Sequence, residues 1–432
     1  MGDMENEYLV RRSRVLDSIH PGVMVVPGGL GSAAYGSSER FRQDSNFHYL
    51  TGFGEPDAVL VLSNLESRSV TLFLRDRDPE GERWDGERLG VERAAKVMQI
   101  DRAHPIGDLD RVLPDLLERC ARLFYQLGRD RRMDDRVLGS IADVRRRRGR
   151  VWWPTTIVES DDILAPMRMV KSDGEIRLLE RAAVISAQVH LEVMAGARAG
   201  MAEHELEATL LGGFRSRGAQ RPAYTPIVAS GPNATVLHYV RNDRRIGPDD
   251  LVLVDAACEY EHYAADITRT FPVSGRFTAP QAAVYDVVLA GQLAAIDAVR
   301  AGATLEDVHQ AAVRVLTTGL VDLGLVAGPV DEAIEQERYK PFFMHRTSHH
   351  LGLDVHDLVR SHQFGEPRPL EVGNVVTVEP GIYVGPAEEI PEEYRGIGVR
   401  IEDDVVVTGD APRVLTAGAP KRREDLERAC RG

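Results

Sequence analysis

Carboxylates and histidines interrupt or end short apolar runs in the last quarter of this 432-residue chain. Four histidines lie within residues 342–357, Glu379 follows the apolar run 375–378, and Glu402 follows Val399-Arg400-Ile401. A buried carboxylate without a partner is costly in free energy, so it takes up a proton, pairs with a cation or binds a metal. Two such carboxylates beside several histidines indicate a metal site.

A faint internal duplication in the second half of the chain adds two further carboxylates to this set. In each copy a predicted helix ends in Arg-Ala-Gly, a histidine expected on a strand follows, and a carboxylate then ends an apolar run. The residues at matching places in the two copies are His238 and His356, Asp255 and Glu379, and Asp266 and Glu402. Two pseudo-symmetric halves, each with helices covering an antiparallel sheet, would bring the four carboxylates together in a central cleft.

Asp255, Asp266, Glu379 and Glu402, with one histidine from the second copy, form a ligand set rich in oxygen. Such ligands suit Mn²⁺ and Co²⁺, and Zn²⁺ or Fe²⁺ also bind them. Four carboxylates neutralise two divalent ions, which favours a dinuclear site whose metals, roughly 3.5–4 Å apart, share a bridging hydroxide. The alternative is that each acid is an ordinary turn residue after a strand. Four acids at duplicated positions argue against that alternative.

The elements that must position these residues fall into two predicted domains, residues 1–168 and 169–432. In the first, apolar runs at 23–26, 59–62 and 70–74 predict buried strands, and helical spacing at 108–120 and 134–148 completes an α/β arrangement. In the second, Ser172 and Glu175 form a capping box that opens a long amphipathic helix.

Composition excludes several classes of function. The net charge of −14 disfavours a nucleic-acid partner, and the basic run 145–150 is interpreted as a solvated helix end. No segment approaches the roughly 20 apolar residues of a membrane helix, and residues 1–14 lack the apolar core of a signal peptide. The three cysteines are too widely spaced for a disulfide framework or a thiolate metal site. We therefore expect a cytoplasmic protein that binds neither nucleic acid nor membrane.

The motifs resemble those of the aminopeptidase P family, the proline-specific branch of the pita-bread metallopeptidases, which are related to prolidase, creatinase and methionine aminopeptidase. The segments that carry the resemblance are 255–260, 265–273, 348–349, 355–357, 377–381 and 396–403 in the second domain, and 41–47, 50–53 and 82–84 in the first. The resemblance implies an α/β creatinase-like N-terminal domain and an α+β pita-bread catalytic domain with pseudo-two-fold internal symmetry.

The resemblance also implies a role for each candidate residue. The expected ligands of two divalent ions, foremost Mn²⁺, are Asp255, Asp266, His349, Glu379 and Glu402. The expected catalytic residues are His238, His345, His356, Glu379 and Arg400. Glu379 would move a proton from the attacking water to the leaving nitrogen, His238 and His356 would donate hydrogen bonds to the tetrahedral intermediate, and Arg400 would orient carboxylates.

The implied reaction is hydrolysis of the bond between an N-terminal residue and a following proline, with a metal-bridging hydroxide as nucleophile. Partners would be peptides with proline in the second position, and the enzyme would be a homodimer or homotetramer. A prolidase that cleaves only Xaa-Pro dipeptides is the nearest alternative, because the same ligands serve both. A metal-free creatinase-type amidinohydrolase and a non-enzymatic binding module on the same fold are further alternatives.

Two residues depart from the family motif His-Gly-x-Ser-His-Trp-Leu-Gly. Arg346 replaces the glycine and His350 replaces the tryptophan. Arg346 either narrows the proline pocket or points to solvent. His349 and His350 would face opposite ways on a strand, and the match to Ser-His selects His349 as the ligand. Leu358-Val359 also replaces the usual Val-Gly, so we expect the specificity loop to differ.

Overall fold

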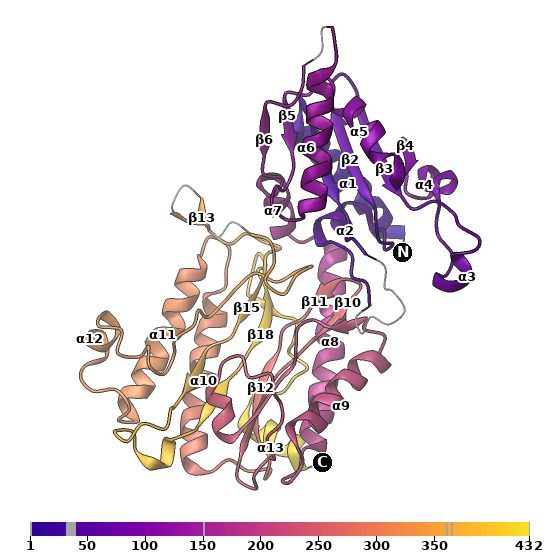
Figure 1. The fold of residues 1–432 in the computed structure, drawn as a ribbon. Coiled ribbons are helices and arrows are strands. Elements are labelled where there is room, and N and C mark those ends of the chain that lie inside the picture. The colour runs from indigo at the N-terminus through magenta and orange to yellow at the C-terminus, as the bar shows by residue number, and fades with distance from the viewer. Residues whose placement is uncertain (1, 32–39, 150–151, 360–361, 364–365, 432) are drawn as a thin grey trace. The chain divides into compact units, whose positions relative to one another are not determined.

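The computed structural model describes residues 2–31, 40–149, 152–359, 362–363 and 366–431. These residues divide into two compact units, Met1–Met167 and Arg168–Gly432, coloured from indigo to magenta and from magenta to yellow in Figure 1. The domain boundary predicted from the sequence, between residues 168 and 169, lies one residue from this division.

The first unit is built on one mixed six-stranded sheet with the strand order β4-β3-β2-β1-β5-β6. Its strands are β1 (Gly22–Pro27), β2 (Val59–Asn64), β3 (Arg68–Leu74), β4 (Arg102–Pro105), β5 (Arg122–Phe124) and β6 (Thr156–Val158). The pairs β1–β2 and β2–β3 are antiparallel, and β3–β4, β1–β5 and β5–β6 are parallel. The three apolar runs predicted as strands are β1, β2 and β3.

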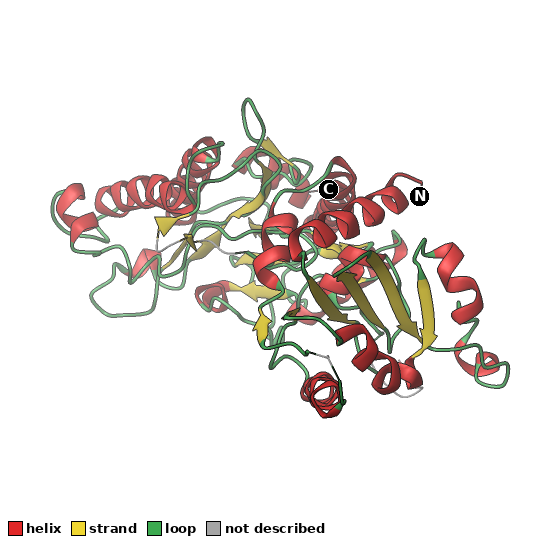
Figure 2. Cartoon of the chain, turned by 90° about the horizontal axis from the view of Figure 1, so that it is seen from above, coloured by secondary structure: helices red, strands yellow, loops and turns green. Residues whose placement is uncertain are grey.

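Helices cover both faces of this sheet (Figure 2). The helices of this unit are α1 (Gly2–Ile19), α2 (Ser45–Thr51), α3 (Glu82–Asp85), α4 (Val91–Val97), α5 (Leu109–Leu117), α6 (Arg131–Arg146) and α7 (Asp161–Met169). Alternate strand residues such as Val23 and Val59 pack against α5 and α6 in one core, while α1 contacts β1 and β2. This arrangement follows from the two-residue period of a strand, which sends alternate side chains to opposite faces.

The two helices predicted in the first unit are present, with shifted ends. Asp130 caps α6 by accepting hydrogen bonds from the amides of Arg132 and Met133, so the helix begins three residues earlier than predicted. The basic run begins in the last turn of α6, and Arg147 after it pairs with Asp115 and Glu118. Residue 150 lies outside the described residues.

The second unit repeats a pattern of two helices followed by short antiparallel strands, which confirms the α+β prediction. Its first half contains α8 (Asp173–Gly196), α9 (Glu203–Ser216), β7 (Arg221–Pro222), β8 (Ile227–Ser230), the 3₁₀ helix η2 (Gly231–Thr235), β9 (Leu251–Asp255), β10 (Cys258–Tyr260), β11 (Tyr263–Ala264) and β12 (Thr268–Pro272). The predicted capping box is formed: Glu175 N donates to Ser172 Oγ, and Ser172 N donates to Glu175 Oε2.

The second half follows the same order. It contains α10 (Ala279–Ala298), α11 (Leu305–Asp322), α12 (Val330–Glu335), β13 (His362–Gln363), β14 (Glu366–Pro367), β15 (Val375–Val378), β16 (Gly381–Tyr383), the 3₁₀ helix η3 (Glu392–Tyr394), β17 (Gly398–Arg400), β18 (Asp403–Val406), β19 (Arg413–Val414) and α13 (Arg423–Arg431). The sheets β12-β9-β8 and β15-β18-β19 are the matching antiparallel sheets of the two halves.

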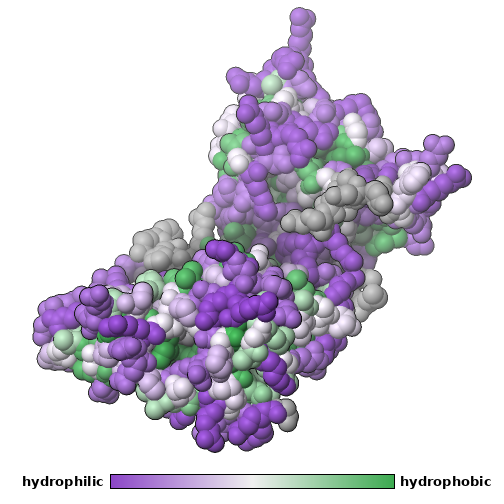
Figure 3. All heavy atoms as spheres, turned by 60° about the horizontal axis from the view of Figure 1, so that its bottom comes forward, coloured by the Kyte–Doolittle hydropathy of each residue, from purple (hydrophilic) through white to green (hydrophobic). Residues whose placement is uncertain are grey.

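Helix α10 corrects the expectation that no segment approaches the length of a membrane helix. Within the described chain it is the one helix that is long and apolar enough for such a span. It packs against α11, its residues Ala295 and Ile296 join a core with Val376 and Val378, and buried Gln292 donates to Asp403. Core helices often have this composition, so α10 is weak evidence for a membrane span. The face drawn in Figure 3 is largely hydrophilic, with hydrophobic atoms in small patches.

Candidate metal centre and active site

The four carboxylates expected as ligands lie at strand ends in both halves of the second unit. Asp255 ends β9 and Asp266 lies two residues before β12, its antiparallel partner. In the second half, Val378 of β15 pairs with Asp403 of β18, which sets Glu379 and Glu402 just beyond the same end of that pair. The duplicated topology thus places an acidic pair at one strand end in each half.

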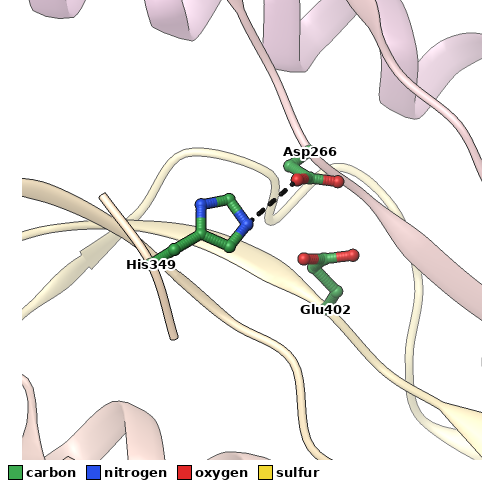
Figure 4. Close-up of side chains that lie close together, drawn as sticks. All are labelled: Asp266, His349 and Glu402. Carbon is green, nitrogen blue, oxygen red and sulfur yellow. Dashed lines mark ion pairs between the residues drawn. The ribbon is translucent and has the colours of Figure 1, made fainter. Parts of the chain in front are cut away.

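Asp266, His349 and Glu402 form a group that could hold a metal ion, because one ligand atom from each lies within 4.8 Å of the others. Figure 4 shows the imidazole of His349 directed at Asp266, with the Glu402 carboxylate beside them. His349 Nε2 is 3.5 Å from Asp266 Oδ2 and 3.6 Å from Glu379 Oε1. The structure therefore brings four of the five expected ligands together, from both halves of the unit.

Asp255, the fifth expected ligand, interacts electrostatically with Arg400 and with Asp266 of the cluster. Its Oδ2 accepts a hydrogen bond from Arg400 Nη2 at 2.5 Å. Its Oδ1 is buried and accepts no hydrogen bond of good geometry among the described residues, although the buried Tyr224 hydroxyl interacts with the same carboxylate. An unpartnered, buried carboxylate oxygen is rare in folded proteins, and a bound cation is one of the few groups that satisfies it.

Burial and mutual repulsion shift the titration of the acidic cluster. Burial raises the pKa of Asp255, raises that of Glu379 to about 7 and raises that of Glu402 well above its usual range, and the neighbouring carboxylates add to each shift. Burial also lowers the pKa of His349, but Asp266 and Glu379 outweigh that effect and raise it to about 9. A divalent cation among these groups would offset the repulsion, so the donor set fits metal ions.

Arg400 links the two halves of the cluster. The buried guanidinium donates to Asp255, to Thr268 Oγ1 at 3.1 Å and to Tyr383 Oη at 3.0 Å. Thr268 in turn donates to Glu402 Oε2 at 2.6 Å. These contacts fix the direction of two carboxylates, as partners of metal ligands commonly do.

Thr268 and Tyr383 were not predicted as site residues. Thr268 lies two residues after Asp266 and therefore on the same side of an extended strand, which is the signal that could have identified it. Tyr383 lies on β16. It is far in sequence from every site residue except Glu379, so no spacing in the sequence could have identified it.

Two of the three candidate catalytic histidines, His345 and His356, lie against the cluster. His345 Nε2 is 2.8 Å from Tyr383 Oη, its Nδ1 is 3.8 Å from Glu379 Oε2, and burial lowers its pKa to about 4. The ring of His356 stands edge-on to that of His349, with centroids 4.4 Å apart, and burial lowers its pKa. His238 is exposed, and its electrostatic interaction with His345 and His356 adds a small effect to the larger effect of burial that lowers the pKa of both.

The expectation that His238 and His356 lie on strands is wrong. Both residues occupy loops, His238 between η2 and β9 and His356 before β13. The apolar residues beside each histidine suggested strands, but neither segment acquires a paired neighbour in the described chain. In a loop the direction of an imidazole is not set by the alternation of side chains along a paired strand.

The two residues that depart from the family motif have different surroundings. His350 is buried outside the metal-binding group, and burial lowers its pKa to about 3, assisted by the charge of Lys171. Arg346 pairs with Glu306 of α11. Both line a pocket of about 480 Å³ that also contacts His349 and His356.

A buried ion network anchors the loop that carries His356. Asp357 Oδ1 is 2.5 Å from Arg168 Nη2, and Asp357 Oδ2 is 2.9 Å from Lys171 Nζ. Burial raises the pKa of Asp357, but these two cations outweigh it and hold the pKa below its usual value. The network fixes the residue next to His356, and sequence reasoning missed it because the partners are 186 and 189 residues apart.

His190 supports the strand end that carries Asp255. Its Nε2 donates to the Ala256 carbonyl at 2.7 Å, and its Nδ1 is buried without a hydrogen-bond partner among the described residues. A proton added to Nδ1 would therefore be a buried donor with no acceptor. Burial accordingly lowers the pKa of His190 to about 4.

We expect His190 to make the free energy of unfolding depend on pH. Its folded pKa lies below its unfolded value of 6.5, so its contribution is complete above pH 6.5 and is lost as the pH falls toward 4. The loss would be about 3 kcal/mol. Urea unfolding between pH 4 and 7.5 measures it as the difference between wild type and His190→Gln, whose amide can still donate to Ala256. Parallel pH curves for the two proteins would contradict this role.

Comparison with known proteins places the chain in a family. Residues 177–409 match the model of metallopeptidase family M24, and residues 8–125 match that of the aminopeptidase P N-terminal domain. The chain is 43% identical over 388 residues to the Xaa-Pro aminopeptidase of Haemophilus influenzae, covering 90% of this chain and 88% of the relative. It is 41% identical over 429 residues to the Xaa-Pro aminopeptidase of Escherichia coli, covering 98% and 96%.

Solved structures agree with this placement. The aminopeptidase PepP of Pseudomonas aeruginosa superposes with a TM-score of 0.96 at 44% identity, covering 99% of this chain and 98% of that one. An Escherichia coli aminopeptidase P variant in complex with substrate gives a TM-score of 0.95 at 39% identity, covering 99% and 98%. The first unit thus contains the aminopeptidase P N-terminal domain and the second has the pita-bread fold, and the chain belongs to metallopeptidase family M24.

Proposed function

We propose that this chain is a metal-dependent aminopeptidase that hydrolyses the bond between an N-terminal residue and a following proline. The observation that carries the proposal is the convergence of Asp266, Glu379 and Glu402 on His349. It occurs in a chain that is 41–43% identical to Xaa-Pro aminopeptidases over nearly its whole length. The proposed partners are peptides whose second residue is proline.

The proposed cofactor is a pair of divalent ions, foremost Mn²⁺, held by Asp255, Asp266, His349, Glu379 and Glu402. The unpartnered Oδ1 of Asp255 and the raised carboxylate pKa values support this assignment. When bound, such ions supply Lewis acidity and activate water at neutral pH. The acidic cluster also suits the cationic amine of a peptide N-terminus.

The surrounding residues supply proton transfer and orientation. Glu379, within 3.8 Å of both His345 and His349, would take a proton from the attacking water and pass it to the leaving proline nitrogen. The lowered pKa values of His345 and His356 keep both rings neutral at pH 7, so each has one N–H to donate. His238 and His356 would direct such donors at the developing oxyanion. Arg400 holds the carboxylate directions throughout.

A peptide panel tests the proposal. We expect Xaa-Pro-Xaa tripeptides to lose their first residue and the matched Xaa-Ala-Xaa tripeptides to remain intact, because proline lacks the amide hydrogen of other residues. Chelation should abolish turnover and Mn²⁺ should restore it, with Co²⁺ and Zn²⁺ as comparisons. Cleavage of Xaa-Pro dipeptides alone would assign a dipeptidase, and metal binding without hydrolysis of any proline peptide would overturn the enzyme assignment.

Arg346 is expected to restrict the pocket beside His349 and His356. Its side chain is 61% exposed and its partner Glu306 is 42% exposed. An exposed ion pair contributes at most about 1 kcal/mol to stability. Arg346→Ala should therefore lower KM by no more than about fivefold and leave kcat unchanged. The reduction in KM should be largest for peptides with bulky side chains.

The control for this variant is Arg314→Ala. Arg314 forms an exposed pair with Asp331 but does not line the pocket. Michaelis–Menten kinetics on peptides of graded side-chain size would separate the two variants. If Arg346→Ala had the same KM as wild type for every peptide, Arg346 would point to solvent without affecting the pocket.

We further infer a homodimer or homotetramer, a cytoplasmic location and a domain boundary between residues 168 and 169. The oligomer is inferred from the resemblance of the motifs, and light scattering after gel filtration measures it. Three free, buried cysteines support a reducing compartment. The division of the structure after Met167 supports the boundary.

A further inference from the structure

The segment that carries His238 has little regular structure to hold it in place. Residues 236–247, between η2 and β9, contain neither helix nor strand apart from an isolated bridge at Arg245. The side chains of Val236, His238 and Val240 are all exposed. Packing of these side chains therefore cannot fix the position of the imidazole, and other contacts must do so.

A single buried carboxylate supplies those contacts. Glu203, the first residue of α9, has no exposed surface. Its Oε1 accepts hydrogen bonds from Ser230 N and Ser230 Oγ, both at 2.7 Å, and from Asn233 Nδ2 at 3.1 Å. Its Oε2 accepts from Tyr239 Oη at 2.8 Å and from Arg244 N at 2.9 Å. Five donors saturate the carboxylate.

The donors lie on both sides of His238 in the sequence. Ser230 and Asn233 precede it, whereas Tyr239 and Arg244 follow it. The Glu203 amide also donates to the Arg244 carbonyl at 3.0 Å, so backbone and side chain hold the same residue. Hydrogen bonds to an ionised acceptor are roughly twice as strong as neutral ones. The loop is thus clamped at both ends, and Tyr239 extends the clamp to the neighbour of His238.

We propose that Glu203 is a positioning residue that holds His238 in the active site by clamping residues 230–244. This inference rests on the proposed function, in which His238 donates a hydrogen bond to the oxyanion. Glu203 itself lies outside the cluster of ligands and acts only through the loop. Because a displacement of 1 Å at a reacting group can reduce a rate about 10²-fold, loosening the clamp should reduce kcat.

The test is a double-mutant cycle between Glu203 and His238. Glu203→Gln keeps the shape of the side chain but turns one acceptor oxygen into an amide that faces N–H and O–H donors. We expect it to reduce kcat by about 10- to 100-fold with little change in KM, and to have no further effect in a His238→Ala background. Tyr239→Phe removes the hydrogen bond to Glu203 Oε2, together with the contacts of the same hydroxyl to Asp243, and should show the same pattern at smaller size. That milder variant decides the question if Glu203→Gln does not fold.

The matched control is Glu205→Gln, two residues along the same helix. Among the described residues, Glu205 Oε2 accepts a hydrogen bond only from the local amide of Ala202, and glutamine serves equally in a capping box. Hydrogen–deuterium exchange gives a readout that does not depend on activity. Exchange in peptides covering 236–247 should rise in Glu203→Gln and Tyr239→Phe and stay unchanged in Glu205→Gln.

The positioning role would be overturned if Glu203→Gln reduced kcat equally in the wild-type and His238→Ala backgrounds. Unchanged exchange in residues 236–247 would also overturn it. These outcomes differ from failure of the proposed function, which would appear as a wild-type protein inactive on every proline peptide. In that case the exchange measurement still decides whether Glu203 clamps the loop.

Discussion

Replacing Asp266 with asparagine is expected to reduce kcat/KM at least about 100-fold and to lower the metal content of the purified protein. Loss of a residue that only orients a metal ligand typically costs 10- to 100-fold in metal affinity or activity, so loss of a ligand itself should cost at least as much. Asp266 is 5% exposed, and its carboxylate lies 3.5 Å from His349 Nε2. An amide in its place removes a charge from the set that balances the cations.

Metal analysis by mass spectrometry, together with hydrolysis of an Xaa-Pro-Xaa peptide, measures both parts of this expectation. Asp297→Asn is the control, because it makes the same chemical change at an exposed position on α10. Its metal content and kcat/KM should equal those of wild type. Full metal content with unchanged kcat/KM in Asp266→Asn would exclude Asp266 as a ligand.

Replacing Arg269 with methionine is expected to destabilise the second unit by about 3–5 kcal/mol, the usual cost of removing one partner of a buried ion pair. Arg269 and Asp403 both have fully buried side chains, and the pair is joined at 2.7 Å. Burial raises the pKa of Asp403, but Arg269 and Lys421 outweigh it and lower the pKa to about 2. The variant would leave Asp403 with one cation instead of two.

Arg269 also binds the backbone around the site and the C-terminal segment. It donates to the carbonyl oxygens of Thr268, Glu402, Ala419 and Pro420. Methionine fills a similar volume but leaves these four acceptors without the guanidinium. Since the Glu402 backbone depends on this contact, we also expect metal affinity to fall about 10- to 100-fold.

Urea unfolding followed by circular dichroism measures the first effect, and titration with Mn²⁺ measures the second. Arg413→Met is the control, because the Arg413–Glu180 pair is 46% exposed at both ends. Such a pair should contribute less than about 1 kcal/mol. Similar losses of stability in the two variants would show that the buried network contributes no more than a surface pair.

Local patterns in the sequence determined much of the fold. The apolar runs that became β1, β2 and β3 end at polar or turn residues, and a strand that is buried on both faces needs only such a run. The Ser172–Glu175 capping box lies within four residues, so its geometry is set by the helix itself. The start of α6 differs from the prediction because Asp130 caps the helix three residues before the point at which the apolar spacing suggested that it begins.

The candidate site was predictable in part, because duplicated acids at strand ends are a pattern in sequence. Loops were predicted less well: His238 and His356 were expected on strands because apolar residues flank them, but only pairing with a neighbour makes a strand. The sequence prediction also missed the apolar length of α10, whose apolar residues face α11 and the β15 core. Burial in a core and burial in a membrane select similar residues.

The sequence by itself determined that this chain has an N-terminal α/β unit, a duplicated α+β unit and an acidic site with a histidine, because each of these is written in periodicity, spacing and residue type. Only the tertiary structure decided how that site is supported. The pairs Arg400–Asp255, Arg269–Asp403 and Lys171–Asp357 join residues 145, 134 and 186 positions apart. The sequence marked Asp255 and Arg400 as candidate site residues but not as partners, and it assigned no role to Arg269, Asp403, Lys171 or Asp357. Each partner becomes identifiable only when the folded chain buries the two charges together.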